Sequence, residues 1–418
     1  MIEVEAHFMI PTLADIQTAR QELRDIIIQT PILPNERLSN DIGARVYLKA
    51  ENTQRSGSFK IRGAYNKISR LTAAERARGI IAHSAGNHAQ GVALAAKLFD
   101  IPATIVMPER APLTKVVATR RLGAEIMLHG ETFDDCAAFA KELQHERGLT
   151  AIHPFNDPDI IAGQGTLGLE IIEAVPETNV IIVPIGGGGL ISGIALAVKT
   201  LMPDIRIIGV QAEGCAAVPT SLAAGQPVTV PVSRTIADGI AVKCPGELTL
   251  PIIQELVDEV VTVTDDEIMR AIAYAVQNAH LVVEGAGAAS LAALISGKVL
   301  SRSNDTICVT LCGGNIDGNL LARIIEQSLV RQGRYILIRT TVDDRPGNLA
   351  PLISQVAQAG AGVVDIFHRR AVWLAPVDRA GIEMVLEVRD EQHGQTVVQH
   401  LTEAGYHVER EWPGLWPE

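Results

Sequence analysis

A lysine at the expected start of a helix is the first residue whose surroundings suggest chemistry. Lys60 follows the small residues Ser56, Gly57 and Ser58, and apolar residues flank it on both sides. Burial and the positive end of a helix both lower the pKa of an amine, as a lysine that forms a Schiff base requires. This segment alone leaves two readings open, a catalytic lysine and an exposed cation in the first helical turn.

A loop of small residues after the expected strand 80–82 has the composition of an anion-binding turn. Such residues expose backbone N–H groups to a carboxylate or a phosphate where a strand leads into a helix. An ordinary loop capped by its serine or asparagine is the alternative, and its histidine alone is more typical of a structural residue. The loop consists of Ser84, Ala85, Gly86, Asn87 and His88.

A run of four glycines directly after the expected strand 181–184 predicts a phosphate-binding cup. Glycines let the backbone approach an anion closely, and the helix that follows adds its positive end. A dinucleotide fingerprint fails because Ser192 occupies its last position, and the chain contains no G-x-x-x-x-G-K-[ST] pattern. The expected cup comprises Gly186, Gly187, Gly188, Gly189 and Leu190.

The five cysteines indicate a reducing compartment rather than a disulfide framework or a metal site. Their number is odd, and no two form a C-x-x-C pair. We therefore expect no bound metal and a cytoplasmic location, and the acidic N-terminus does not resemble a signal peptide. Cys312 precedes two glycines at the end of the expected strand 306–311, where a buried small apolar residue is the plain interpretation.

The composition is that of a globular enzyme that does not bind polyanions. The chain has 418 residues with 36 Lys and Arg against 48 Asp and Glu, for a formal net charge of −12. Such an excess of acid repels phosphate backbones and anionic lipids, so we expect neither nucleic acid nor membrane as a partner. Apolar residues make up 47% and charged residues 20%, which excludes disorder.

Alternating strands and helices up to residue 330 predict an α/β region with parallel sheets covered on both faces. The first helix is expected over 11–29, and a small lobe of about residues 50–150 is inserted in a larger one. After a polar turn at 331–335, residues 336–418 show the order β-α-β-β-α-β, which is typical of a ferredoxin-like domain. The last helix of that domain is expected over 395–404.

Taken together, these motifs resemble those of fold-type II pyridoxal-phosphate enzymes and, among them, the threonine dehydratases (threonine ammonia-lyases). The motifs occur in the family's order as SGSFKIRGA (56–64), SAGNHAQGVA (84–93), AGQGT (162–166), VPIGGGGLISG (183–193), ADG (237–239) and CGGNID (312–317). The C-terminal part resembles an ACT domain, an amino-acid-sensing module, with DDRPGNLAPL (343–352) at its ligand loop.

The resemblance implies a role for each motif. Lys60 would carry pyridoxal phosphate, with Phe59 beside it, and would act on the substrate's α-proton. Asn87 would bind the ring oxygen, residues 186–190 the phosphate, and Cys312 would face the ring nitrogen. The loop 84–88 would hold the substrate carboxylate. Phe155 has two readings, contact with the substrate methyl group and loop packing, and Glu284 could either approach the ring or cap a helix.

The implied reaction is β-elimination of L-threonine to 2-oxobutanoate and ammonia. An effector such as isoleucine or valine would bind the C-terminal domain, and the chain would form a homodimer or homotetramer. Related racemases carry a second serine where this chain has Ala85, so we expect no substantial racemisation. The alternatives are an L-serine or hydroxyaspartate dehydratase, a non-catalytic amino-acid-binding regulator and, more distantly, a nicotinamide enzyme.

Overall fold

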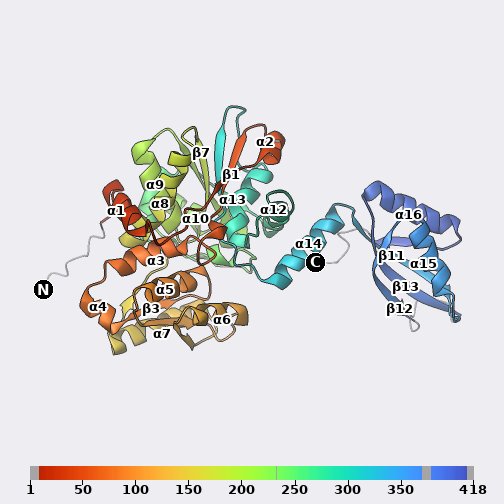
Figure 1. Ribbon diagram of the computed structural model, residues 1–418, viewed down its shortest axis with the longest axis horizontal. Coiled ribbons are helices and arrows are strands. Elements are labelled where there is room, and N and C mark those ends of the chain that lie inside the picture. Colours follow the sequence, from red (N-terminus) through yellow and green to blue (C-terminus); the bar gives the residue numbers. More distant parts are fainter. Residues whose placement is uncertain (1–8, 232, 370–377, 412–418) are drawn as a thin grey trace. The chain divides into compact units, whose positions relative to one another are not determined.

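The protein is described from a computed structural model, which covers residues 9–231, 233–369 and 378–411. The chain divides into two compact units, Met1–Asp317 and Gly318–Glu418 (Figure 1). Residues 370–377 and 412–418 of the predicted regulatory domain lie outside the described ranges. Within those ranges, no helix has both the length and the apolar character needed to cross a membrane.

A six-stranded sheet forms the centre of the first unit. Its order is β1-β2-β10-β7-β8-β9, and every neighbouring pair is parallel except β1 with β2. Strands β7 and β10 are buried along their whole length, as expected for a parallel sheet with helices on both faces. The strands are β1 Ile32–Pro34, β2 Arg45–Lys49, β7 Val180–Pro184, β8 Arg206–Ala212, β9 Glu259–Val263 and β10 Thr306–Thr310.

Helix α8, Pro158–Ala174, is buried on all sides over residues 160–172 and packs against both α3 and α9. Asp157 caps its start by accepting hydrogen bonds from the N–H groups of Asp159 and Ile160. The other helices around the large sheet are α1 Leu13–Leu23, α2 Glu36–Ile42, α9 Gly189–Leu201, α10 Ala217–Ala224, α11 Thr249–Leu256, α12 Asp265–Asn278 and α13 Gly285–Ile295, with 3-10 turns η1 Glu51–Thr53, η2 Glu213–Cys215 and η3 Asp238–Ile240.

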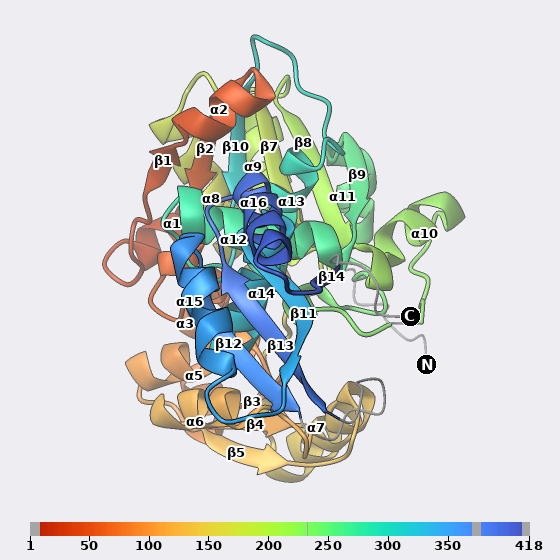
Figure 2. The ribbon, with the colours of Figure 1, turned by 90° about the vertical axis from the view of Figure 1, so that its right-hand side faces the viewer.

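A second, smaller sheet of four parallel strands has the order β5-β4-β3-β6. Helix α5 packs on α3, and α7 lies against β3 and β4; Figure 2 shows these strands side by side. The strands are β3 Ile80–His83, β4 Ala103–Met107, β5 Glu125–Leu128 and β6 Thr150–Ala151, and the helices are α3 Lys60–Ser69, α4 Ala73–Arg78, α5 Asn87–Leu98, α6 Leu113–Arg121 and α7 Phe133–Arg147.

The second unit has the predicted order β-α-β-β-α-β, preceded by α14, Gly318–Arg331. Its antiparallel sheet runs β12-β13-β11-β14, the ferredoxin-like arrangement. Alternate residues of β11 and β13 form its core with Leu352 and Leu401 from the two helices. The elements are β11 Tyr335–Asp343, α15 Leu349–Gln358, β12 Gly362–Arg369, β13 Arg379–Glu387, α16 Glu391–Glu403 and β14 Glu409–Glu411.

Two predicted helices differ in length from the observed ones. The helix expected over 11–29 ends at Leu23, because the β-branched run Ile26–Ile28 disfavours helix. The helix expected over 395–404 begins earlier, at Glu391, where Asp390 caps it by accepting a hydrogen bond from the N–H of His393. Helices α2, α4, α8, α10 and α11 and strands β1, β6 and β9 were not predicted.

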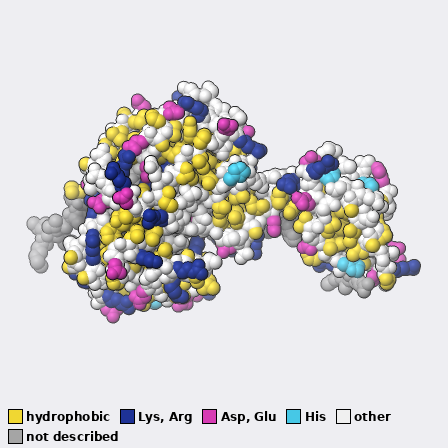
Figure 3. Space-filling model, in the orientation of Figure 1, with side chains coloured by type: hydrophobic (Ala, Val, Ile, Leu, Met, Phe, Trp, Pro, Cys, Tyr) yellow, Lys and Arg dark blue, Asp and Glu magenta, His cyan; other side chains and the backbone are white. Residues whose placement is uncertain are grey.

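Charged side chains of both signs are interspersed over the face shown in Figure 3. Several form exposed ion pairs, such as Arg45 with Glu177 and Arg206 with Glu259. An exposed pair contributes at most about 1 kcal/mol to stability, so these charges chiefly favour solubility.

Candidate active site

Lys60 is the first residue of α3, and its amine lies beside the segment that leads into α8. Its Nζ donates a hydrogen bond to the Pro154 carbonyl at 3.0 Å and lies 5.1 Å from the centre of the Phe59 ring. A Cβ at Gly91 would lie 3.0 Å from the carbonyl carbon and from the Cβ of Lys60. The glycine in α5 therefore permits the close contact that fixes the start of α3.

The environment of Lys60 lowers the pKa of its amine. Burial lowers the pKa of Lys60 to about 8, although the neighbouring Cys312 and Glu284 act in the opposite direction. The positive end of α3 also disfavours a cation in the first turn. Lys60 is thus closer to a nucleophile and base at physiological pH than an ordinary lysine is.

The glycine loop between β7 and α9 is hydrogen-bonded to residues at and just before the start of α11. Gly188 has a φ of +97°, a left-handed conformation that favours glycine. The Gly187 carbonyl accepts hydrogen bonds from the Thr249 hydroxyl at 2.6 Å and from the Gly246 N–H at 3.2 Å. Because the first N–H groups of a helix have no partner within it, the start of α9 at Gly189 offers donors and a positive end to an anion.

Phe155 packs on this glycine loop. A Cβ at Gly187 would lie 2.3 Å from the Phe155 ring, and a Cβ at Gly189 would lie 2.9 Å from the Cβ of Phe155. His153 meets the ring edge-on, with 4.7 Å between the centroids, and its Nδ1 accepts a hydrogen bond from the Phe155 N–H at 3.2 Å. Phe155 therefore connects the glycine loop with Pro154, the partner of Lys60, and its contact with a substrate methyl group stays a prediction.

The loop 84–88 leads from β3 into α5, and its asparagine belongs to a polar cluster. Asn87 Nδ2 donates a hydrogen bond to Glu284 Oε1, and Asn87 Oδ1 accepts one from Asn315 Nδ2 at 2.7 Å. The Ser84 hydroxyl accepts a hydrogen bond from the Gly86 N–H at 3.2 Å, which shapes the turn. Ala85 is half-buried against the core of the small sheet.

His88 faces the core of the small sheet. Its side chain is buried, and Nε2 lies 2.9 Å from the Ile152 carbonyl oxygen. Burial holds the pKa of His88 well below its usual value, so the ring is neutral. This geometry favours a structural role for the ring and leaves only the backbone of His88 as a contributor to the loop.

Cys312 lies just after β10 and is joined to the start of α3. Its carbonyl accepts a hydrogen bond from the Phe59 N–H at 3.2 Å, and Ser58 pairs with Gly313 in an isolated β-bridge. The Sγ atom is 3.5 Å from the Thr310 hydroxyl. Burial raises the pKa of the Cys312 thiol well above its usual range, so this position presents a neutral group.

Glu284 and Asn315 complete the site, and the sequence only partly indicated them. Glu284 stands before α13 without capping it through its side chain, and instead accepts the hydrogen bond from Asn87. Burial, with Asp238 adding to it, raises the pKa of Glu284 to about 7. Asn315 occurs in the motif 312–317, but only the fold shows that it reaches both Asn87 and the Ser56 carbonyl.

These groups suit a cofactor that carries an aldehyde and a phosphate. The amine of Lys60, with its lowered pKa, suits the aldehyde, and the loop before α9 suits the phosphate. A bulkier residue in the loop would collide, since a Cβ at Gly188 would lie 2.7 Å from the Thr249 hydroxyl. The chain thus has matching groups for both ends of such a molecule.

Comparison with known proteins gives a consistent assignment. Residues 23–313 match the family model described as pyridoxal-phosphate dependent enzyme. The L-threonine ammonia-lyase of Thermotoga maritima is 47% identical over 397 residues, which cover 95% of this chain and 98% of that protein.

Solved structures of related enzymes match more than three quarters of the chain. Maize serine racemase is 38% identical with a TM-score of 0.73. The match covers 77% of this chain and 99% of the maize chain. The processed threonine deaminase isoform 2 of Solanum lycopersicum is 38% identical with a TM-score of 0.71. The match covers 78% of this chain and 92% of the Solanum chain. The chain belongs to the family of pyridoxal-phosphate-dependent enzymes.

Proposed function

We propose that this enzyme converts L-threonine to 2-oxobutanoate and ammonia by β-elimination. The observation that carries the proposal is Lys60, a buried amine with a pKa near 8, in the contact chain that runs through Pro154 and Phe155 to the glycine loop. The 47% identity with an L-threonine ammonia-lyase, in an alignment that covers 95% of the chain, supports threonine as the substrate.

The site residues take the roles expected from their positions. Lys60, Phe59, Asn87, residues 186–190 and Cys312 would hold pyridoxal phosphate, and residues 84–88 would hold the substrate carboxylate. When bound, the cofactor supplies an aldehyde that links to amines and a ring that withdraws electrons from the substrate's α-carbon. A neutral thiol at Cys312 cannot keep the ring nitrogen protonated as a carboxylate would, and this favours prompt loss of a β-substituent over transamination.

Proton movement would centre on Lys60. Its Nζ, which loses its proton more readily than an ordinary lysine because burial lowers the pKa to about 8, would remove the α-proton of the substrate. The 3-hydroxyl group would leave as water, and its proton would come from the phosphate group that the backbone N–H groups of residues 186–190 would hold. The Asn87–Glu284 hydrogen bond would hold the opposite side of the site while these protons move.

The pH dependence of cofactor uptake follows from the lowered pKa of Lys60. Only a neutral amine reacts with an aldehyde, so the uptake rate of the cofactor-free protein should rise about tenfold per pH unit below pH 8 and level off above it. Stopped-flow absorbance from pH 6.5 to about 10 measures this rate. With N-acetyl-lysine amide as control, the rate should still be rising at the end of this range, because its amine has a pKa of about 10.4. The same continued rise for the enzyme would contradict the assignment.

A serine racemase is the second candidate, because maize serine racemase matches the fold at 38% identity. Racemisation needs an acid on the face of the substrate opposite Lys60, and Ala85 offers none in the loop that would hold the substrate. Assays with L-threonine and L-serine, read as 2-oxo acid and as D-amino acid, separate the candidates. Faster formation of D-serine than of 2-oxobutanoate would reject the proposal, and a higher kcat/KM for L-serine would reassign the substrate.

We further propose that the second unit is an ACT domain that binds an amino-acid effector. The β-α-β-β-α-β unit and the segment 343–352 support this, and the Thermotoga relative extends over 95% of the chain, hence over this unit as well. Isoleucine or valine should change the KM for threonine in the full chain by about 5-fold or more, a typical coupling energy of about 1–3 kcal/mol. Deletion of residues 334–418 should remove this response, and an unchanged response would refute the sensing role.

A further inference from the structure

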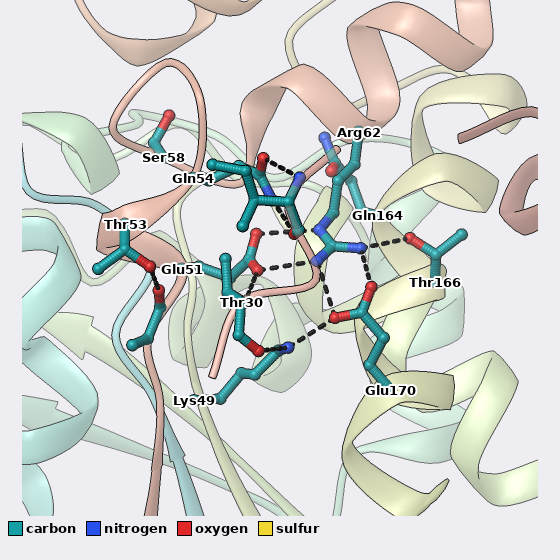
Figure 4. Close-up of polar contacts among 12 residues, drawn as sticks. Thr30, Lys49, Glu51, Thr53, Gln54, Ser58, Arg62, Gln164, Thr166 and Glu170 are labelled. Atoms are coloured by element: carbon teal, nitrogen blue, oxygen red, sulfur yellow. Dashed lines mark hydrogen bonds and ion pairs between the residues drawn. The ribbon is translucent and has the colours of Figure 1, made fainter. Parts of the chain in front are cut away.

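A buried cluster of four charged side chains includes Arg62, which follows Lys60 by two residues in α3 (Figure 4). Its members are Lys49 at the end of β2, Glu51 in η1, Arg62 in α3 and Glu170 in α8. Arg62 and Glu51 have no exposed side-chain surface, and that of Lys49 is 1% exposed. Two positive and two negative charges balance, which a cluster removed from water requires.

Arg62 uses every N–H group of its guanidinium in this cluster. It donates to both oxygens of Glu51 at 2.8 and 2.9 Å and to both oxygens of Glu170 at 2.6 and 3.0 Å. The fifth bond goes to the Thr166 hydroxyl at 3.1 Å. Such a planar, two-sided fork fixes orientation as well as charge, and a lysine cannot reproduce it.

The two carboxylates are held from their other sides. Glu51 accepts a hydrogen bond from the Thr30 hydroxyl, and Glu170 accepts one from Lys49 Nζ at 2.5 Å. Burial alone would raise the pKa of Glu51, but Arg62 more than offsets this and holds it below its usual value. The carboxylate of Glu51 therefore stays ionised at neutral pH and keeps its hold on Arg62.

The cluster is connected to Cys312 through the backbone. The Leu311 N–H donates to the Lys49 carbonyl at 2.9 Å, and the Leu311 carbonyl accepts from the Asn52 N–H at 2.8 Å. Leu311, the residue before Cys312, is thus clamped by Lys49 and by the residue after Glu51. On the other side of the cluster, Arg62 lies in the same helical turn as Lys60.

We propose that Arg62 is a positioning residue that fixes Lys60 relative to Cys312 through its paired bonds to Glu51 and Glu170. None of these side chains needs to touch the substrate. The cluster joins α3, which carries the Lys60 amine, to the end of β10, which carries the Cys312 thiol. A change in the paired bonds of Arg62 would therefore displace Lys60 relative to Cys312. This inference rests on the proposed role of Lys60 and adds a residue to the machinery that serves it.

The test compares Arg62→Lys and Glu51→Gln with Lys67→Met in the full-length holoenzyme. Lys67 also joins α3 to α8, through ion pairs with Asp157 at 2.8 Å and Asp159 at 3.1 Å, but it lies two turns away from Lys60. Arg62→Lys and Lys67→Met both weaken contacts between α3 and α8, and Glu51→Gln weakens the contact between α3 and η1. Only Arg62→Lys and Glu51→Gln change the paired hydrogen bonds of the Arg62 guanidinium.

For Arg62→Lys and Glu51→Gln we expect kcat to fall between about 10-fold and 100-fold, with KM within about threefold of the wild type. The visible circular dichroism of the bound cofactor should fall by about half or more, because it reports how the cofactor is held. Tm should fall by about 6 °C or more, as expected when a buried ion pair is broken. Lys67→Met should change kcat and the visible signal by less than about twofold.

Equal kcat and visible dichroism in the two fork variants and in Lys67→Met, with only Tm reduced, would overturn the proposal. Failure of both fork variants to fold would also overturn it, since the cluster would then serve folding alone. The dichroism is measured without substrate. A wild-type enzyme that is inactive on threonine but has a visible signal that depends on Arg62 would therefore reject the proposed substrate while supporting the positioning role.

Discussion

Replacement of Lys60 with alanine is expected to slow the formation of 2-oxobutanoate from threonine by at least about 10³-fold. The variant loses the amine that would link to the cofactor aldehyde and that would accept the α-proton. The two side chains that act on the pKa of Lys60 are Cys312 and Glu284, and neither is an amine. Steady-state rates at saturating threonine and cofactor measure the loss.

The fold should tolerate this change. The only hydrogen bond described for Lys60 Nζ goes to the Pro154 carbonyl, so its removal leaves the core of α3 intact. Lys67→Ala, in the same helix, is the matched control and should keep the rate within about threefold of wild type. Retention of a tenth of the wild-type rate by Lys60→Ala would show that another group performs the chemistry.

The motifs at strand ends could be predicted from the sequence because their function constrains short segments. The glycine run 186–189 and the loop 84–88 each follow an apolar strand and precede a helix, and all three elements carry local patterns. Parallel strands bring their carboxyl ends to one edge of a sheet, so such loops form sites without further information. The start of α3 at Lys60 was also predicted, although no strand directly precedes it.

Helix α8 could not be predicted from periodicity, because it is apolar on all sides. A helix that is buried all round lacks the alternation of polar and apolar faces on which such predictions depend. Two local features could have revealed it, the cap residue Asp157 and Pro158 in the first turn. The motif 162–166 falls within this helix, so at least two of its residues, Gly163 and Gly165, serve helix packing rather than contact with a ligand.

The cluster around Arg62 was also beyond the reach of the sequence. Its members come from four separate elements, and Lys49 and Glu170 lie 121 positions apart. Charged residues are rarely fully buried, so a sequence places Glu51 and Arg62 on the surface by default. Only the fold shows that these charges balance one another.

Glycines in α8 and α9 carry the largest expected effect on stability. A Cβ at Gly193 would lie 2.3 Å from the Ile161 carbonyl oxygen and 2.5 Å from the Gly165 nitrogen. Both neighbours are backbone atoms, so no side-chain rotation can relieve the contact. Gly165 mirrors this arrangement, because its own Cβ would lie 2.7 Å from the Gly193 carbonyl oxygen.

We therefore expect Gly193→Ala to lower the free energy of unfolding by about 2 kcal/mol or more, measured by urea and far-UV circular dichroism on cofactor-free protein. The cost of separating α8 from α9 exceeds the gain of up to about 1 kcal/mol that alanine brings to a helix interior. Gly318→Ala is the control, because a Cβ there meets no atom within 4 Å, and its stability should change by less than about 0.5 kcal/mol.

Separation of the helices would also move α3, which packs on α8. Gly193→Ala should therefore weaken cofactor binding, although residue 193 lies a full turn beyond the glycine loop. Unchanged stability in Gly193→Ala would mean that the two helices are packed less closely than this structure shows.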